Sequence, residues 1–247
     1  TFFGNPDLSV TAATVDAFDA TLDHAFSETL SVRNHLRWAD YDKMYQNVYP
    51  SSVNATGTLV TLAAYSNATQ RKNLFNQTDL VWKLTTGSIQ HTVLAGAELG
   101  RQITDNFRQT GYFAPGSNVV PLANPNVNVP VEFRQSATDA ANHGVAKVAA
   151  FYLQDQIDFS PNWQAIIGLR HDDFSVDLRN NRTGEVLRSD DGMLSPRAGL
   201  VYKPLDNVSF YASYSKAFQP RAGDQLASLS ASNASLKPES SVNREIG

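Results

Sequence analysis

The sequence has no cysteine in its 247 residues, which excludes disulfides and thiolate metal sites. Its formal net charge of −4 argues against a protein that binds nucleic acid through a basic surface. No run approaches the roughly 18 apolar residues that a membrane-spanning helix requires. What the sequence does contain is aromatic residues, nine Tyr and thirteen Phe among them. Such a content suits surfaces on which ring bodies contact apolar groups while ring edges stay hydrated.

Apolar and polar residues alternate with a period of two, which predicts β-strands rather than helices. Phe18 and Leu22 fall on one face of such a strand, and Asp19 and Asp23 on the other. A further strand is expected after the turn at residues 86–88 and continues through about residue 101. With it, we count about eight full strands and a ninth that begins near Ser241. The other alternating stretches are residues 30–38, 74–84, 148–159, 163–178, 195–203 and 208–216.

The connections between these strands alternate in length. Short turns are expected near residues 27–28, 86–88, 160–162 and 204–207. Long connections are expected at roughly residues 42–68, 103–143, 179–193 and 218–240. Short connections on one side and long ones on the other are typical of outer-membrane barrels.

One face of the predicted strands is apolar and the other carries charge. The charged face comprises Arg33, Arg37, Asp79, Lys83, Glu98, Arg170, Asp172 and Arg197. This fits lipid outside and a hydrated interior, although the solvent face of a soluble sandwich could look the same. Aromatic residues near strand ends favour the barrel, because they are typical of interfacial girdles. They are Trp38, Tyr41, Phe159, Trp163, Tyr202 and Tyr214.

The sequence therefore predicts an all-β fold, an antiparallel transmembrane β-barrel segment. An odd strand count leaves two open sheet edges, which hydrocarbon does not tolerate. We expect residues 1–247 to be a portion of a larger closed barrel.

Several segments, in order along the chain, resemble barrel strands of TonB-dependent siderophore receptors. Among the clearest are His91-Thr92-Val93-Leu94-Ala95-Gly96-Ala97-Glu98 and Tyr211-Ala212-Ser213-Tyr214-Ser215-Lys216-Ala217-Phe218. The segment 108–113 is similar to the catecholate-siderophore subgroup. The other matching segments are residues 76–80, 152–156, 168–172, 195–202 and 236–247.

This resemblance implies a barrel of about 22 strands that is plugged by an N-terminal domain. Residues 1–247 would be its central portion, with plug and terminal strands absent. The implied function is ferric-siderophore uptake across the bacterial outer membrane, energised by TonB. The implied partners are the ferric siderophore, the TonB complex and outer-membrane lipid or lipopolysaccharide, with no nucleic acid. The resemblance implies neither an enzyme nor a cofactor.

Eight residues are candidates for ligand binding in the extracellular loops and vestibule. Ferric catecholates are anionic and rimmed by aromatic rings, so cations and aromatic residues suit them through charge attraction and cation–π contact. The alternative is that these are merely solvated loop residues. The candidates are Arg101, Arg108, Tyr112, Phe113, Arg197, Lys216, Phe218 and Arg221.

Two other classes of function stay open at this stage. A small outer-membrane barrel enzyme, a protease or lipase, would need catalytic groups at the long-loop rim. Adjacent residues of a strand point to opposite faces, so His171 and Asp172 cannot form a dyad directly. His91, His143 and His171 are too scattered for a metal site. A passive porin is the second alternative.

Overall fold

A computed structural model describes residues 4–124, 126, 128–221, 229–232 and 234–247. These residues form one eleven-stranded antiparallel sheet. No helix among them is long and apolar enough to cross a membrane. The strands are β1 (Val10–Ala25), β2 (Leu30–Val53), β3 (Leu59–Thr86), β4 (Ile89–Phe113), β5 (Val119–Pro121), β6 (Val131–Arg134), β7 (Ala141–Ser160), β8 (Trp163–Asn180), β9 (Val186–Leu205), β10 (Val208–Gln219) and β11 (Glu239–Ile246).

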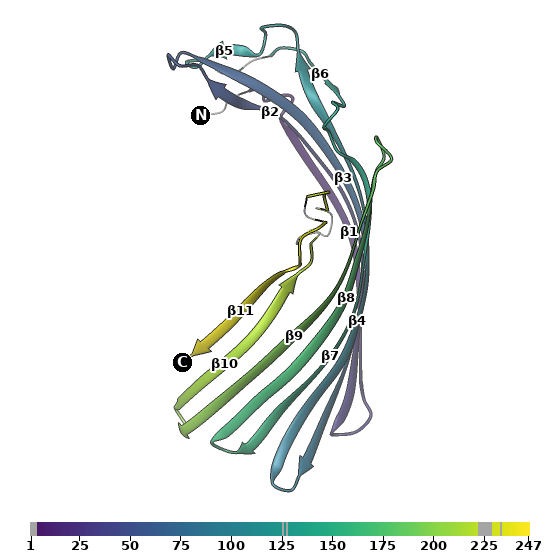
Figure 1. Cartoon of the computed structure of the whole chain (residues 1–247), viewed down its shortest axis with the longest axis vertical. Coiled ribbons are helices and arrows are strands. Elements are labelled where there is room, and N and C mark those ends of the chain that lie inside the picture. Colours follow the sequence, from purple (N-terminus) through teal and green to yellow (C-terminus); the bar gives the residue numbers. More distant parts are fainter. Residues whose placement is uncertain (1–3, 125, 127, 222–228, 233) are drawn as a thin grey trace.

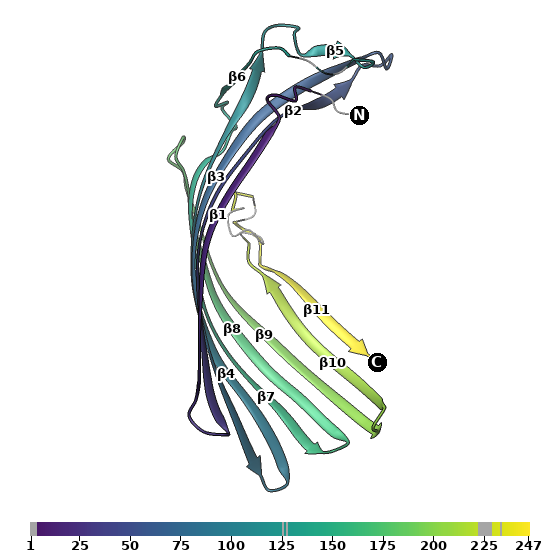
Figure 2. The ribbon, with the colours of Figure 1, turned by 180° about the vertical axis from the view of Figure 1, so that it is seen from behind.

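The sheet follows the chain, in the order β1-β2-β3-β4-β7-β8-β9-β10-β11, with β5 beside β3 and β6 beside β4. This confirms the expected eight strands and the ninth near Ser241, which lies in β11. The sheet is curved like part of a barrel wall, with one convex and one concave face (Figure 1). Seen from behind, β10 and β11 turn toward the concave side, and β1 and β11 are the sheet edges (Figure 2).

Strand register decides which side chains share a face. Phe18, Trp38 and Leu74 are directly opposite one another on three successive strands. They lie on the convex face, and their side chains are substantially exposed. Because neighbouring residues alternate, Asp19 and its partner Arg37 lie on the concave face. The same alternation places all eight charged residues predicted for the polar face on the concave side, which confirms that prediction.

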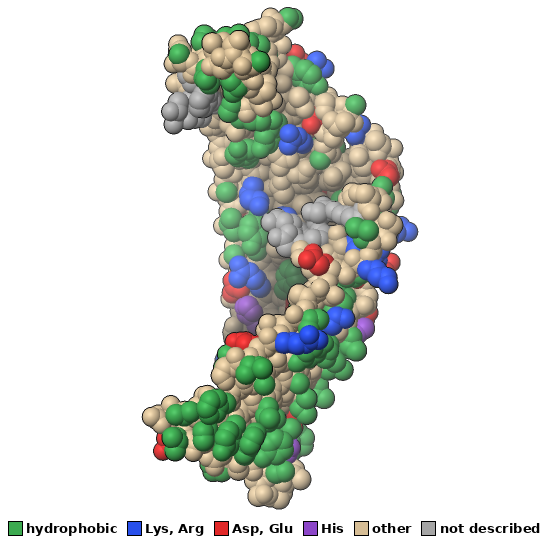
Figure 3. All heavy atoms as spheres, turned by 60° about the vertical axis from the view of Figure 1, so that its left-hand side comes forward, with side chains coloured by type: hydrophobic (Ala, Val, Ile, Leu, Met, Phe, Trp, Pro, Cys, Tyr) green, Lys and Arg blue, Asp and Glu red, His purple; other side chains and the backbone are tan. Residues whose placement is uncertain are grey.

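Figure 3 shows Lys, Arg, Asp and Glu side chains along the hollow of the sheet and also on its outer side, with apolar side chains gathered at the two ends of the molecule. On the convex face, Trp163 and Tyr202 stack at a centroid distance of 4.4 Å near the short turns. Tyr41 lies an odd number of residues from Trp38 and so faces the hollow. The prediction that Tyr41 belongs to a lipid-facing interfacial girdle was therefore wrong.

The short turns lie where they were predicted, but three of the four long connections are shorter than expected. β2 and β3 are joined by residues 54–58 alone, and β4 continues to Phe113. β8 and β9 are joined by residues 181–185. The reason is that ladder hydrogen bonds continue beyond the apolar belt, where both faces meet water and hydrophobic alternation fades. The connection predicted at 218–240 is close to its expected length, because β10 ends at Gln219 and β11 begins at Glu239.

Two small hydrophobic clusters form at the long-loop end. On the convex side of β2 and β3, residues of the 113–133 segment pack over Val48, Val60, Leu62 and Ala64. On the concave side, Leu229 packs with side chains of β7, β8 and β9. These concave partners are Ala146, Phe174, Val176, Leu178 and Met193. The long-loop end is therefore covered on both faces by its own connections.

A hydrogen-bond network crosses three strands of the concave wall at a glycine. The hydroxyl of Tyr152 on β7 donates to Asp79 on β3 and accepts from the Gln77 amide at 3.0 Å. Between them lies Gly96 on β4, which is paired with both Tyr152 and Asp79. A Cβ at Gly96 would lie 2.2 Å from the Tyr152 ring. The missing side chain is what allows the tyrosine to reach across β4.

Replacing Gly96 with Ala is expected to destabilise the folded full-length protein by about 1–3 kcal/mol, the usual cost of overpacking. The added methyl group would displace Tyr152 from Asp79. Gly192→Ala is the matched control, since its nearest heavy atoms lie at an ordinary 3.8 Å. Urea titration of the protein in lipid vesicles measures both variants. Equal stability of the two variants would contradict the account.

Candidate ligand-binding site

The eight residues predicted to bind ligand divide between the faces of the sheet. Arg108, Tyr112 and Arg197 lie on the concave face. Arg101, opposite Leu74, and Phe113 lie on the convex face of β4. A ligand in the hollow cannot contact both sets directly. The remaining three, Lys216, Phe218 and Arg221, lie at or just beyond the end of β10.

A group of tyrosines surrounds Arg108 on the concave face of the long-loop end. The Arg108 guanidinium carbon lies 4.1 Å from the centroid of the Tyr65 ring. Tyr45 and Tyr49 of β2 lie 5.5 Å and 5.7 Å from the same ring. Burial and the neighbouring Tyr45 raise the pKa of Tyr65, so its hydroxyl stays protonated. We call Tyr45, Tyr49, Tyr65 and Arg108 the tyrosine–arginine cluster.

A second stacked pair continues this surface. The Arg134 guanidinium of β6 lies 3.8 Å from the centroid of Tyr112 on β4. Arg134 also lies 3.6 Å from Glu132, in an exposed ion pair. At the long-loop end of the concave face, cations thus lie over aromatic rings on both sides of Thr110.

The buried carboxylate of Asp139 holds Arg108 in place through an ion pair. This carboxylate lies 3.3 Å from the Arg108 Nε and is 4% exposed. It accepts hydrogen bonds from the backbone N–H groups of Thr110, at 2.9 Å, and Ser136, at 2.8 Å, and from the Thr110 hydroxyl. Burial raises the pKa of Asp139, but the hydrogen bonds from Ser136 and Thr110 outweigh burial and lower the pKa below its ordinary value. Asp139 therefore stays charged and attaches the 135–140 segment to β4.

Arg221 is held by the wall rather than pointing freely into the hollow. Its Nη2 lies 2.6 Å from the Asp191 carboxylate, which is nearly buried. Its Nη1 also donates to the carbonyl of Ala234. Ala234 and Phe218 pack against the concave hydrophobic cluster that contains Leu229. Arg221 thus tethers the β10–β11 connection to the inside of the wall.

The other predicted residues lie away from the tyrosine–arginine cluster. Lys216 lies 4.5 Å from the centroid of Phe218 and faces the convex side. Phe113 packs in the convex hydrophobic cluster. Arg197 lies over Gly168, lower in the concave wall. The structure therefore brings only Arg108 and Tyr112 of the predicted set into the aromatic concave surface.

The sequence analysis missed Tyr45, Tyr49 and Tyr65. They fell inside residues 42–68, which were predicted to be a loop. The signal that could have found them is their spacing: Tyr41, Tyr45, Tyr49 and Tyr65 are all odd-numbered and share one face of two long strands. No group of three or more His, Asp or Glu side chains among the described residues could hold a metal ion.

Comparison with known proteins identifies the relationships of the chain. A family model described as "TonB dependent receptor-like, beta-barrel" matches residues 1–247. The metal-pseudopaline receptor CntO of Pseudomonas aeruginosa is 29% identical over 234 residues, which cover 92% of this chain and 32% of that protein. The chain thus spans about a third of the length of this relative.

Solved structures show the same fold. The siderophore receptor PiuA of Acinetobacter baumannii superposes with a TM-score of 0.85 at 23% identity, covering 100% of this chain and 39% of that chain. The ferric-catecholate import receptor Fiu of Escherichia coli K12, in its closed form, gives a TM-score of 0.80 at 20% identity, with the same coverage of both chains. The curved sheet is therefore a segment of such a barrel.

Attachment of the 135–140 segment is expected to weaken in acid. Because the pKa of Asp139 is lowered in the folded state, its charge stabilises that state at every pH above the ordinary pKa of 3.8. This stabilisation is lost as the pH falls through the lowered pKa. Hydrogen exchange of the Thr110 and Ser136 amides, corrected for intrinsic rates, should show constant protection near neutral pH and falling protection as the pH drops below the ordinary value of 3.8.

Asp139→Asn should reduce this protection near neutral pH and remove most of its pH dependence. The control is Asp177→Asn, whose carboxylate is in an exposed pair with Arg188. Pronounced acid sensitivity in the Asp139 variant would disprove the assignment.

Proposed function

The chain belongs to the TonB-dependent receptor β-barrel family, and on that premise we propose that the full-length protein imports a ferric siderophore. Proteins of this family are located in the bacterial outer membrane. The observation that carries the proposal is the family match over all residues, joined to a cationic, aromatic surface on the concave wall. In the full-length protein, further strands would close the barrel around this hollow.

The site's chemistry suits an anionic ligand with aromatic groups. Arg108 supplies a charge that is held over the Tyr65 ring, and the Tyr45 and Tyr49 rings extend the apolar surface. Tyrosine hydroxyls can donate hydrogen bonds to catecholate or carboxylate oxygens. Because Asp139 orients Arg108 before any ligand arrives, little side-chain entropy is lost on binding. The iron would be coordinated by the siderophore and not by the protein.

We propose a catecholate-type siderophore, because the concave surface presents rings beside cations. The names of the relatives span several ligands, among them ferrichrome in Escherichia coli and ferrioxamine in Yersinia enterocolitica. They also include a catecholate siderophore receptor in Escherichia coli. The aromatic cluster is therefore the feature that favours catecholate in this chain.

Transport itself would depend on parts outside the described sheet. A plug domain and its TonB contact would provide the energy coupling, and the concave wall would provide a rigid, hydrated surface around the plug. Arg170 is fixed in this wall between Glu98, at 2.9 Å, and Asp172, at 2.7 Å. The relatives are named as receptors, which favours this function over the passive porin and the small barrel enzyme.

Uptake of radioactive iron supplied as a ferric tris-catecholate complex tests the function. Cells that express the full-length protein should accumulate iron, and loss of TonB or collapse of the proton gradient should abolish accumulation. Accumulation that persists without TonB would indicate a passive pore. Parallel uptake of a ferric hydroxamate complex tests the proposed ligand class.

Arg108→Ala should weaken binding of the ferric tris-catecholate complex about tenfold, the value of a partly desolvated cation–π and charge contact. Arg33→Ala is the matched control, since Arg33 lies on the same face near a short turn and pairs with Asp23 in solvent. Quenching of protein fluorescence by the complex measures both variants. Equal affinity of wild type and the Arg108 variant would remove Arg108 from the site.

A further inference from the structure

A groove of about 740 Å³ lies on the convex face, away from the hollow. Most of its lining side chains belong to the face that carries Trp38 and Leu74. It extends across β2, β3, β4, β7, β8 and β9, and small residues such as Ala149 and Gly192 form part of its floor. Because this face of the barrel turns away from the ligand pathway, transport does not account for the groove.

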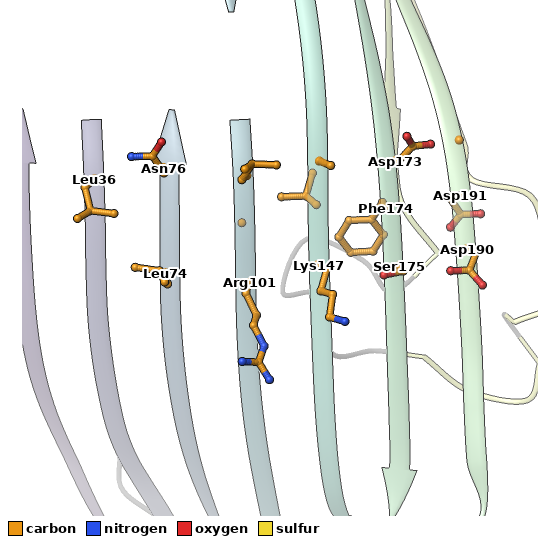
Figure 4. A pocket seen from close by; sticks show the side chains of 15 residues that line it. Leu36, Leu74, Asn76, Arg101, Lys147, Asp173, Phe174, Ser175, Asp190 and Asp191 are labelled. Carbon is orange, nitrogen blue, oxygen red and sulfur yellow. The ribbon is translucent and has the colours of Figure 1, made fainter. Parts of the chain in front are cut away.

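Two cations lie side by side in the groove. Arg101 of β4 and Lys147 of β7 are direct cross-strand partners, and Figure 4 shows their side chains extending in the same direction. Both residues are exposed. Like charges placed directly opposite each other destabilise a sheet. Among the described residues, no carboxylate lies within ion-pair distance of either cation.

Some cations on the same face have carboxylate partners and others do not. Lys72 lies 3.7 Å from Asp40, and Arg188 lies 2.7 Å from Asp177, whereas Lys216 lies over the Phe218 ring. What sets Arg101 and Lys147 apart from these three is that they are two cations in direct cross-strand register. An anion bound between them would relieve their mutual repulsion.

The groove also has an apolar end. Leu36, level with Asn76, lies toward the short turns, and Leu74 lies level with Arg101 (Figure 4). Leu99, also level with Asn76, lines the groove on the short-turn side. Leu74 and Leu99 are 49% and 57% exposed, and they continue the lipid-facing belt. The cations thus lie at the boundary where the apolar belt ends and charged residues begin, which is the depth of lipid headgroups.

Carboxylates on the opposite side of the groove restrict where an anion can lie. Asp173 and Asp190 come from β8 and β9 (Figure 4). Asp173 lies 3.2 Å from His171, and Asp190 has no ion-pair partner among the described residues. Their negative charge repels a phosphate from the β8–β9 side and confines it to Arg101 and Lys147.

We propose that this groove binds a phosphate-bearing lipid of the outer leaflet, with its phosphate on Arg101 and Lys147. One acyl chain would lie along Leu74 and Leu99. The match of charge at one end and apolar surface at the other supports a lipid rather than a free anion. The site is independent of the siderophore site, because the two lie on opposite faces of β4.

Native mass spectrometry of the full-length protein in maltoside detergent tests the proposal, with dioleoylphosphatidic acid as the probe. Each cation near a membrane surface contributes about 1 kcal/mol, so Arg101→Ala combined with Lys147→Ala should weaken binding about thirtyfold. Lys72→Ala is the control cation on the same face and should leave binding unchanged. Dioleoylglycerol, which has the same chains without phosphate, should bind weakly to every variant.

Several outcomes would overturn the proposal. Unchanged binding of dioleoylphosphatidic acid in the double variant would remove the cation pair from any lipid site. Competition by inorganic phosphate at equal concentration would show a simple anion site. A dimer of the wild type that the double variant loses would assign the groove to a second copy of the chain. Matching thermal unfolding of all variants ensures that lost binding does not reflect lost folding.

Discussion

The structure depends on an unbroken ladder of backbone hydrogen bonds between neighbouring strands. In hydrocarbon every N–H and C=O must find a partner within the protein, because no water is present to replace it. An antiparallel ladder meets this need and also fixes the direction of every side chain. Phe18, Trp38 and Leu74 meet on the lipid side for this reason, and Asp19 and Arg37 meet in the hollow. Within each strand, whether a residue number is odd or even therefore decides whether the side chain faces the lipid or the hollow.

Parity explains which part of the candidate site could be predicted from the sequence. The prediction grouped cations expected near the long-loop ends, but Arg101 and Arg108 are seven residues apart on one strand and so face opposite sides. The prediction placed Arg101 at the end of a strand and Arg108 in the loop that follows, for which parity has no meaning. Once β4 is known to continue to Phe113, the two arginines separate. One faces the tyrosines of the hollow, and the other faces the lipid boundary beside Lys147.

The fold was more predictable than the site, for a physical reason. Within the membrane the lipid enforces apolar residues at every second position, which produces a clear sequence pattern over residues 74–84 and 163–169. Above the membrane both faces meet water, so the pattern fades although the ladder persists. Residues 42–53 of β2 were assigned to a loop on that account. The backbone hydrogen bonds that extend this strand do not change the hydrophobic pattern of the sequence. The attachment through Asp139 is also not visible in that pattern, because it joins residues that are distant in sequence.

Extending the strands beyond the membrane changes what the ligand-binding surface can do. A loop would have to order its side chains on binding and lose entropy for each one. Tyr45, Tyr65 and Arg108 are instead carried by three paired strands, so their spacing is set by the ladder before a ligand arrives. Asp139 then removes the remaining freedom of Arg108. The same rigidity prevents this wall from closing over a ligand. Any closure would have to come from parts of the protein other than these paired strands.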